Sequence, residues 1–325
     1  MSKKLKILLV ILGVLILGSF LATYLIFQFQ APPKTEAQPT FFEIKPNTSS
    51  TTVAEELKNQ GLIKSKWLFL IYLKLSKRTI KAGTYELSLS LNLFGVIEKL
   101  EKGEVKEWLV TFPEGFSLKD MGERLEEKGV VKKEDFLKEA SLISKYQKEF
   151  PFLSEIKTPN LEGYLFPDTY KFPLKVTSEE IVKKMLKNFD QKINQKVKLF
   201  ETITLASIVE REAKKEEDRA KIASVYLNRL SKGMQLEADP TVQYAKGNWE
   251  PITKEDYEAI NSPYNTYKYP GLPPGPISNP GLASIKAVLQ PEKTDYLYFF
   301  HTKEGETIFS QTKEEHERKK KEYMK

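Results

Sequence analysis

The sequence ITLASIVEREAKKEEDRAKIASVYLN, residues 203–228, sets the interpretation of this chain, because it places an acid where a helix should carry an apolar side chain. A helix over residues 202–212 turns by about 100° per residue, so positions seven apart return to the same face. Glu212 follows Leu205 by seven residues and lies on the predicted apolar face, whereas Glu210 lies about 140° away from it. We therefore expect the side chain of Glu212 to be buried.

Burial would change the chemistry of this carboxyl group. Desolvation disfavours the charged form and raises the pKa, so a buried glutamate can carry a proton at neutral pH and donate it as a general acid. The alternative is that Glu212 ends its helix and extends into solvent, as acids near helix ends commonly do.

The N-terminal segment is predicted to cross a membrane. Residues 7–27 form an uncharged apolar run, which is long enough for one spanning helix and longer than the core of a cleaved signal peptide. Lys3, Lys4 and Lys6 precede the run, and the positive-inside rule then keeps the N-terminus in the cytoplasm. We expect a single-pass protein of the cytoplasmic membrane with a cytoplasmic tail at 1–6, an anchor at 7–28 and a tether at 29–40.

The composition argues against several functional classes. The 325 residues include no cysteine, which removes disulfides and cysteine nucleophiles. The two histidines, His301 and His316, stand apart from any ligand pattern, so neither a metal nor another cofactor is expected. The net charge of +7 comes from Lys and Arg interleaved with Glu, a pattern typical of solvated helices, and no nucleic-acid partner is predicted.

The pattern of elements predicts an α+β fold built from three parts beyond the tether. Residues 41–104 and 105–155 are each predicted to form a small β-α module, and they align at a spacing of 68 residues. This spacing pairs Leu57 with Leu125 and Gly61 with Gly129. Residues 156–325 are predicted to form a mainly helical α+β domain that closes with a hairpin over 296–310.

Two loop regions suggest a carbohydrate cleft. Residues 236–244 read LEADPTVQY, and residues 262–281 read SPYNTYKYPGLPPGPISNPG. Prolines stiffen such loops, and tyrosines offer flat faces with hydroxyl tips, which suit the apolar faces and hydroxyl edges of sugars. The alternative is that the proline-rich loop only packs over the core.

Five segments together resemble a known family, the endolytic murein transglycosylases of the MltG/YceG type. They are KAGTYEL at 81–87, EGYLFPDTY at 162–170, ASIVEREA at 206–213, ADPTVQY at 238–244 and YNTYKYPGLPPGPISNPG at 264–281. In that family the second Glu of the Glu-x-Glu pair is the catalytic acid, which is Glu212 in this sequence. The resemblance also implies that the first module is LysM-like and that 156–325 is the catalytic domain.

The resemblance implies cleavage between N-acetylmuramic acid and N-acetylglucosamine inside nascent peptidoglycan strands, limiting strand elongation. Glu212 would act as both acid and base, and the muramyl C6 hydroxyl would attack C1 to leave a 1,6-anhydro end, so no second carboxylate is needed. The other residues that the motifs assign to the cleft are Tyr226, Asn228, Arg229, Asp239, Thr241, Gln243, Tyr244, Tyr264, Asn265, Thr266, Gly271, Leu272, Pro273 and Pro274. The implied partners are glycan strands, the membrane and peptidoglycan synthases.

Two other functions fit the same sequence. A lysozyme-like hydrolase would use Asp239, Glu237 or Glu162 as a second acid at about 5 to 9.5 Å from Glu212. A non-catalytic scaffold would bind the wall and leave Glu212 with a structural role only.

Overall fold

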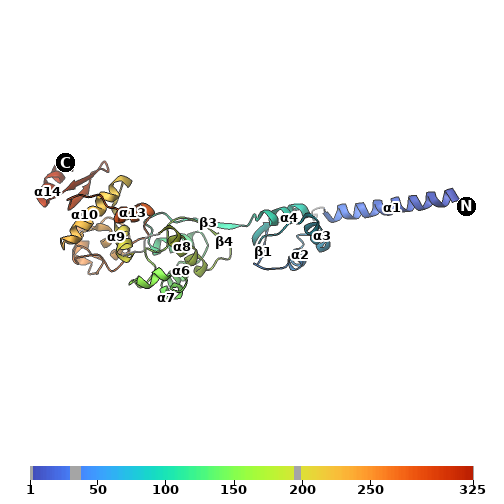
Figure 1. The fold of residues 1–325 in the computed structure, drawn as a ribbon, viewed down its shortest axis with the longest axis horizontal. Coiled ribbons are helices and arrows are strands. Elements are labelled where there is room, and N and C mark those ends of the chain that lie inside the picture. The colour runs from blue at the N-terminus through green and yellow to red at the C-terminus, as the bar shows by residue number, and fades with distance from the viewer. Residues whose placement is uncertain (1–2, 30–37, 194–198, 325) are drawn as a thin grey trace. The chain divides into compact units, whose positions relative to one another are not determined.

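A computed structural model describes residues 3–29, 38–193 and 199–324, and most of the predicted tether at 29–40 lies outside these residues. The chain divides into two compact units, Met1–Trp108 and Leu109–Lys325. Helices and small two-stranded sheets occur together (Figure 1), which confirms the α+β prediction at this level.

The first helix has the length and composition of a membrane span. Helix α1 runs from Lys3 to Phe29, and its window Leu5–Tyr24 has a mean hydropathy of 2.6. Twenty residues of helix extend about 30 Å, the thickness of a bilayer core. None of this window is buried against other parts of the protein. These properties fit the predicted anchor at 7–28.

The first module is a strand–helix–helix–strand unit. Strand β1 (Thr40–Ile44) pairs antiparallel with β2 (Gly83–Leu87), and α2 (Ser50–Asn59) and α3 (Lys66–Ser76) lie between them in the chain. Helix α4 (Leu93–Lys102) follows. Apolar residues from all five elements form one core, which includes Phe42, Leu57, Phe69, Tyr85 and Leu100.

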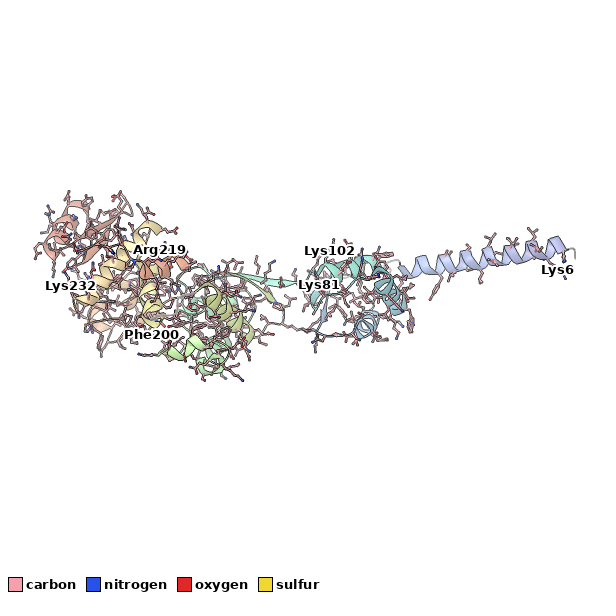
Figure 2. The ribbon with its side chains drawn as sticks, viewed as in Figure 1. Lys6, Lys81, Lys102, Phe200, Arg219 and Lys232 are labelled. Atoms are coloured by element: carbon pink, nitrogen blue, oxygen red, sulfur yellow. The ribbon has the colours of Figure 1, made fainter. Side chains whose placement is uncertain are left out.

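Local signals explain where these helices begin and end. The hydroxyl of Ser49 accepts the N–H of Thr52 at the start of α2, an ordinary N-cap. At the end of α4, Gly103 adopts a left-handed conformation at φ 72°, where a glycine is least strained. The Lys81 side chain donates to the Lys102 carbonyl at 3.0 Å and satisfies a further group of that last turn (Figure 2).

The second copy repeats this order. Strand β3 (Glu107–Thr111) pairs with β4 (Thr169–Pro173), and α5 (Leu118–Glu127) and α6 (Lys133–Ala140) lie between them in the chain. Short helices, α7 (Ile143–Tyr146) and the 3₁₀ turn η1 (Pro151–Glu155), precede β4. The residues paired by the 68-residue spacing behave alike, since Leu57 and Leu125 are both fully buried and Gly61 and Gly129 have φ of 72° and 71°.

Two buried polar side chains join this second copy to the rest of its unit. The Glu162 carboxyl accepts the N–H of Leu118, at the start of α5, at 3.0 Å and the amide of Asn279 at 3.1 Å. The side-chain oxygen of Asn279 accepts the N–H of Leu165 at 3.0 Å, and its amide donates to the Phe116 carbonyl. Burial raises the pKa of Glu162 to about 8. The turn before α5 is therefore fixed to the C-terminal part of the chain.

Helices dominate the remainder of the second unit, as predicted. The longest three are α8 (Ser178–Lys192), α9 (Leu199–Glu212) and α10 (Arg219–Ser231), with the 3₁₀ turn η2 (Glu216–Asp218) before α10. Helix α9 packs against α10, α11 (Asp239–Lys246) and α13 (Leu282–Leu289), so it is central.

The C-terminal segment contains the predicted hairpin and two helices that were not predicted. Strands β5 (Tyr298–His301) and β6 (Thr307–Ser310) pair antiparallel, which confirms the hairpin. Helices α12 (Lys254–Ala259) and α14 (Lys313–Tyr323) have no fully buried residue, so their sequences lack the apolar periodicity by which helices are recognised.

We predict that Gly163→Ala destabilises the protein by at least about 3 kcal/mol, combining overpacking with left-handed backbone strain. Gly163 has φ 90°, and an added Cβ would lie 2.5 Å from the Pro276 ring and 2.8 Å from Ile203. Gly233→Ala is the matched control, because Gly233 also has positive φ but has open space around it, and it should cost only about 1 kcal/mol. Urea unfolding of residues 38–325 measures both, and equal losses would contradict the packing argument.

Candidate active site

Glu212 is the last residue of α9, and its carboxyl group reaches a cleft. Its Oε1 accepts a hydrogen bond of 2.8 Å from the hydroxyl of Tyr226 on α10, whose ring is almost fully buried. The side chain is thus oriented by a neighbouring helix, and it is only partly accessible to solvent. The sequence predicted a buried side chain, and the structure gives Glu212 intermediate exposure at the cleft.

The surroundings keep Glu212 protonated in part at neutral pH. Burial raises its pKa to about 7, and the negative charge of Asp239 acts in the same direction. The Tyr226 hydrogen bond and the positive charge of Arg229 favour the carboxylate and oppose this shift. A carboxyl group with a pKa near neutrality is suited to both donating and accepting a proton.

The cleft around Glu212 has a volume of about 530 Å³ and two unlike walls. One wall carries acids and tyrosines, namely Glu237, Asp239, Tyr257 and Tyr267. The other wall is formed by β5 and α14, with Tyr298, Phe299, Phe300, His301, Lys313, His316, Glu317, Lys320 and Met324.

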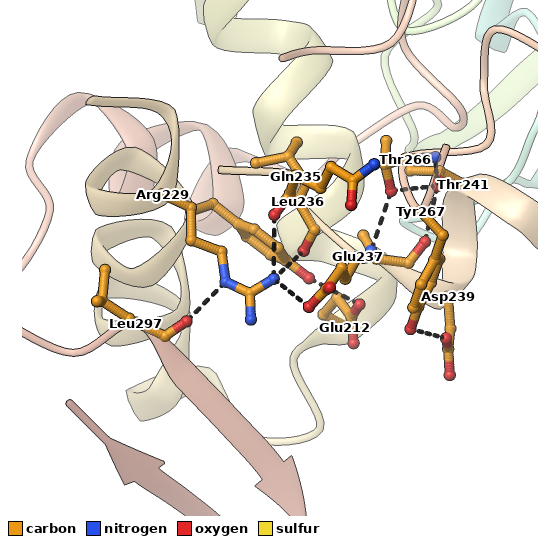
Figure 3. Close-up of polar contacts among 12 residues, drawn as sticks. Glu212, Arg229, Gln235, Leu236, Glu237, Asp239, Thr241, Thr266, Tyr267 and Leu297 are labelled. Carbon is orange, nitrogen blue, oxygen red and sulfur yellow. Dashed lines mark hydrogen bonds and ion pairs between the residues drawn. The ribbon is translucent and has the colours of Figure 1, made fainter. Parts of the chain in front are cut away.

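Arg229 ties the two walls together. Its Nε donates to the carbonyl of Leu297, just before β5, at 2.6 Å, and its guanidinium lies 4.9 Å from the centre of the Tyr298 ring. Its Nη1 donates to the carbonyl of Leu236 at 2.8 Å and to the Glu237 carboxylate at 2.9 Å (Figure 3). With only 6% of its surface exposed, Arg229 sets the width of the cleft as well as its charge.

Asp239 is fixed in the cleft by two tyrosines. As the first residue of α11, it accepts the hydroxyl of Tyr257 at 2.9 Å and that of Tyr267 at 2.7 Å. The two rings lie 4.3 Å apart and tilt toward each other. The Asp239 charge is therefore held where it acts on Glu212.

Three predicted residues support this wall from behind, and one of them, Thr241, lies on α11, where the sequence predicted a loop over 236–244. The hydroxyls of Thr241 and Thr266 bond to each other at 2.8 Å, and the Asn265 amide donates to the carbonyls of Tyr257 and Ile260 at 3.0 and 2.9 Å. Thr241, Asn265 and Thr266 are essentially fully buried. They position the tyrosines and do not line the cleft.

The other predicted residues lie elsewhere. Asn228 donates to the carbonyls of Thr294 and Tyr296, and Gln243 to those of Trp249 and Glu250. The rings of Tyr244 and Tyr264 lie 5.0 Å apart at an angle of 50°, and neither lines the cleft around Glu212. Leu272 packs against the core, and neither it nor Gly271, Pro273 or Pro274 is among the residues that line the cleft. The structure thus brings together Glu212, Tyr226, Arg229 and Asp239.

The histidines belong to the cleft, which the sequence did not indicate. His301 lies on β5 and His316 on α14, and burial lowers the pKa of both. Within the described residues, neither His316 Nδ1 nor His301 Nε2 has a hydrogen-bond partner. The sequence did not reveal that both histidines line one cleft, because they reach it only through the folding of the hairpin and α14.

The helical face that singled out Glu212 proved less informative than expected. Helix α9 is buried on almost every side, including at Thr202, Thr204 and Ser207. Glu210 is also buried, although it lies on another side; it pairs with Arg219 at 3.0 Å and accepts the N–H of Gly281 at 2.9 Å. Burial alone therefore does not distinguish the two acids, but the cleft does, since Glu210 is fully engaged in packing.

Only two of the three acids proposed for a hydrolase line the cleft. Glu162 is enclosed by Leu118, Asn279 and Tyr244 and does not line the cleft. Glu237 and Asp239 do line it. Among the residues that the structure describes, no group of three or more acids or histidines could hold a metal ion.

The fold and the site define a class of enzyme with one buried acid in an aromatic cleft, carried on a chain with an apolar N-terminal helix. The profile of the YceG-like family matches residues 42–322, and the chain belongs to this family.

Individual relatives agree with this assignment. The chain is 39% identical over 303 residues to the endolytic murein transglycosylase of Bacillus subtilis (strain 168), covering 86% of this chain and 84% of that protein. It is 32% identical to the endolytic murein transglycosylase of Streptococcus pneumoniae serotype 2, covering 82% of this chain and 55% of that protein. A crystal structure of a YceG-like protein from Listeria monocytogenes superposes with a TM-score of 0.60 at 38% identity, covering 87% of this chain and 99% of that one.

Two substitutions should move the pKa of Glu212 in opposite directions. Tyr226→Phe removes a hydrogen bond to the carboxylate and should raise the pKa, while Asp239→Asn removes a negative charge and should lower it. The pKa is measured by NMR titration of a ¹³C-labelled Glu212 carboxyl, which needs no assumption about activity. Tyr269→Phe, in an exposed loop, is the control and should change nothing. Shifts of the same sign in both variants would refute the stated causes.

Proposed function

We propose that the protein is a membrane-anchored endolytic transglycosylase that cleaves peptidoglycan strands between N-acetylmuramic acid and N-acetylglucosamine. The observation that carries this proposal is the Glu212 carboxyl, with a pKa of about 7, in a cleft walled by tyrosines. The names of the family relatives support the same activity and substrate.

In the proposed reaction Glu212 serves twice. Protonated Glu212 donates to the glycosidic oxygen while the C1–O bond breaks and C1 gains oxocarbenium character. The resulting carboxylate then takes the proton of the muramyl C6 hydroxyl as that oxygen bonds to C1. The product is a 1,6-anhydro end, no water is consumed, and Glu212 regains its proton.

The neighbours of Glu212 fit these two roles. The Tyr226 hydroxyl at 2.8 Å stabilises the carboxylate that forms after proton donation and keeps it from rotating away. The fixed negative charge of Asp239 favours positive charge at C1 in the transition state. Tyr257 and Tyr267 offer ring faces for the sugars, beside the reacting bond.

Hydrolysis by a second acid is the alternative that remains chemically open. Both candidate acids that line the cleft already have partners, since Glu237 pairs with Arg229 and Asp239 accepts two tyrosine hydroxyls at its Oδ1. Hydrogen bonds and a positive charge stabilise these carboxylates and make them weaker bases toward a water molecule, which favours internal attack by the substrate.

The N-terminal parts would confine this activity to new wall. We propose that α1 spans the cytoplasmic membrane with its N-terminus inside, so that the catalytic unit meets strands close to the outer face. The first module would hold glycan as a LysM-like unit, and cleavage there would limit strand elongation beside peptidoglycan synthases.

Glu212→Gln should lower the rate of strand cleavage by at least about 100-fold, because the amide cannot donate or accept the proton. The assay is mass spectrometry of the strand ends after incubation with residues 38–325, and Glu217→Gln, an exposed acid after the same helix, should cleave normally. Anhydro ends that depend on Glu212 are the expected product. Reducing ends would instead establish hydrolysis, and intact strands with the unchanged protein would leave only a scaffold.

A further inference from the structure

Helix α3 of the first module carries an exposed apolar stripe that its own fold does not use. Trp67, Ile71 and Leu75 are spaced by four residues, span an arc of about 80° on the helix, and expose 67, 50 and 79% of their surfaces. The opposite side of α3 packs into the core through Phe69 and Leu73. A helix that is apolar on both sides has one apolar side that the core of this module does not cover.

The second copy shows that the architecture does not require apolar residues at the first two positions of this stripe, although Leu75 corresponds to the exposed Leu142. Aligning the buried residues of α3 and α6 pairs Phe69 with Phe136 and Leu73 with Ala140. In this alignment Trp67 corresponds to Glu134 and Ile71 to Lys138, and both of these charged residues are exposed. The same strand–helix–helix–strand unit therefore folds with charges at these positions, so the apolar residues of the first copy serve another purpose.

Among the described residues, the charged side chains beside the stripe that form no ion pair are positively charged. Lys74 and Lys77, at the end of α3, are exposed and form no ion pair within the described residues. Lys66 is paired with Glu55, and Arg78 with Glu101 at 2.5 Å. Free lysines beside a tryptophan and aliphatic residues are the composition of a helix that lies in the interface of an anionic membrane.

We propose that the α3 stripe docks the first module onto the outer surface of the anionic bilayer that α1 crosses. This inference rests on the proposed anchor. Residues 30–39 join α1 to the module, and even a fully extended chain of this length spans at most about 35 Å. The tether therefore holds the module at high effective concentration near the lipid surface, where three apolar side chains and two lysines suffice for an interaction too weak to persist in solution.

The test uses the full chain in vesicles of phosphatidylcholine with phosphatidylglycerol, some of whose acyl chains are brominated near the headgroup. Trp67 is one of three tryptophans, and the difference between the wild type and Trp67→Phe isolates its emission. Brominated lipid should quench the Trp67 emission at least about twofold. Ile71→Glu with Leu75→Glu should abolish this quenching, while Leu142→Glu, an exposed leucine of the second unit, should leave it intact.

Each other result overturns the proposal. A chain that resists alkaline extraction but whose Trp67 is quenched by aqueous iodide and not by brominated lipid is anchored without docking. Release by alkali would refute the anchor, and the docking with it. Protection of Trp67 that appears only with added glycan strands, with a synthase or at high protein density would assign the stripe to that partner instead of to lipid.

Discussion

The burial of one helix governs the second unit. Helix α9 is enclosed from Thr202 to Val209, and even its polar side chains are used for packing. The hydroxyl of Ser207 accepts the N–H of Ile277 at 3.0 Å, and the Ser207 carbonyl accepts the hydroxyl of Ser278. One turn later Glu210 receives the N–H of Gly281, at the start of α13. The proline-rich loop is therefore bonded along α9, and the end of this buried helix delivers Glu212 to the cleft. Because an unpaired buried polar group costs about 1 to 3 kcal/mol, these contacts fix the register of the loop.

The cleft consists of two layers of residues, one that lines the open space and one that is buried behind it. Glu212, Asp239 and the tyrosines face the space where a substrate would lie. Behind them Thr241, Asn265 and Thr266 satisfy loop carbonyls and each other without access to solvent. Preorganised sites depend on such support, since a reacting group must be held close to its productive position before the substrate arrives. Under the proposed function, these residues behind the cleft would support the reaction without contacting the substrate.

Features set by local sequence were predictable, and those set by tertiary contacts were not. The apolar span, the repeat at 68 residues and the closing hairpin each follow from patterns within a few dozen residues. The cleft depends on α14, whose sequence has no apolar periodicity, and on His301 and His316, which lie far from Glu212 in the sequence. The motifs identified Asn228 and Gln243 as cleft residues but did not indicate where their side chains point. Both side chains donate to backbone carbonyls away from the cleft. Spacing within a motif shows that residues act together, whereas only the packed structure shows which of them face the ligand.

The two copies of the small module differ in how they join the rest of the chain and in the surface that they expose. In the second copy, the N–H of Leu118 at the start of α5 binds Glu162, and this copy lies within the single unit Leu109–Lys325. The first copy closes its own sheet with β2 and has a core of its own. Where the second copy presents Glu134 and Lys138 to solvent, the first presents Trp67 and Ile71. A unit that has its own core can carry different surface residues without loss of the fold, and the copy that follows α1 is the one with the exposed apolar residues on its helix.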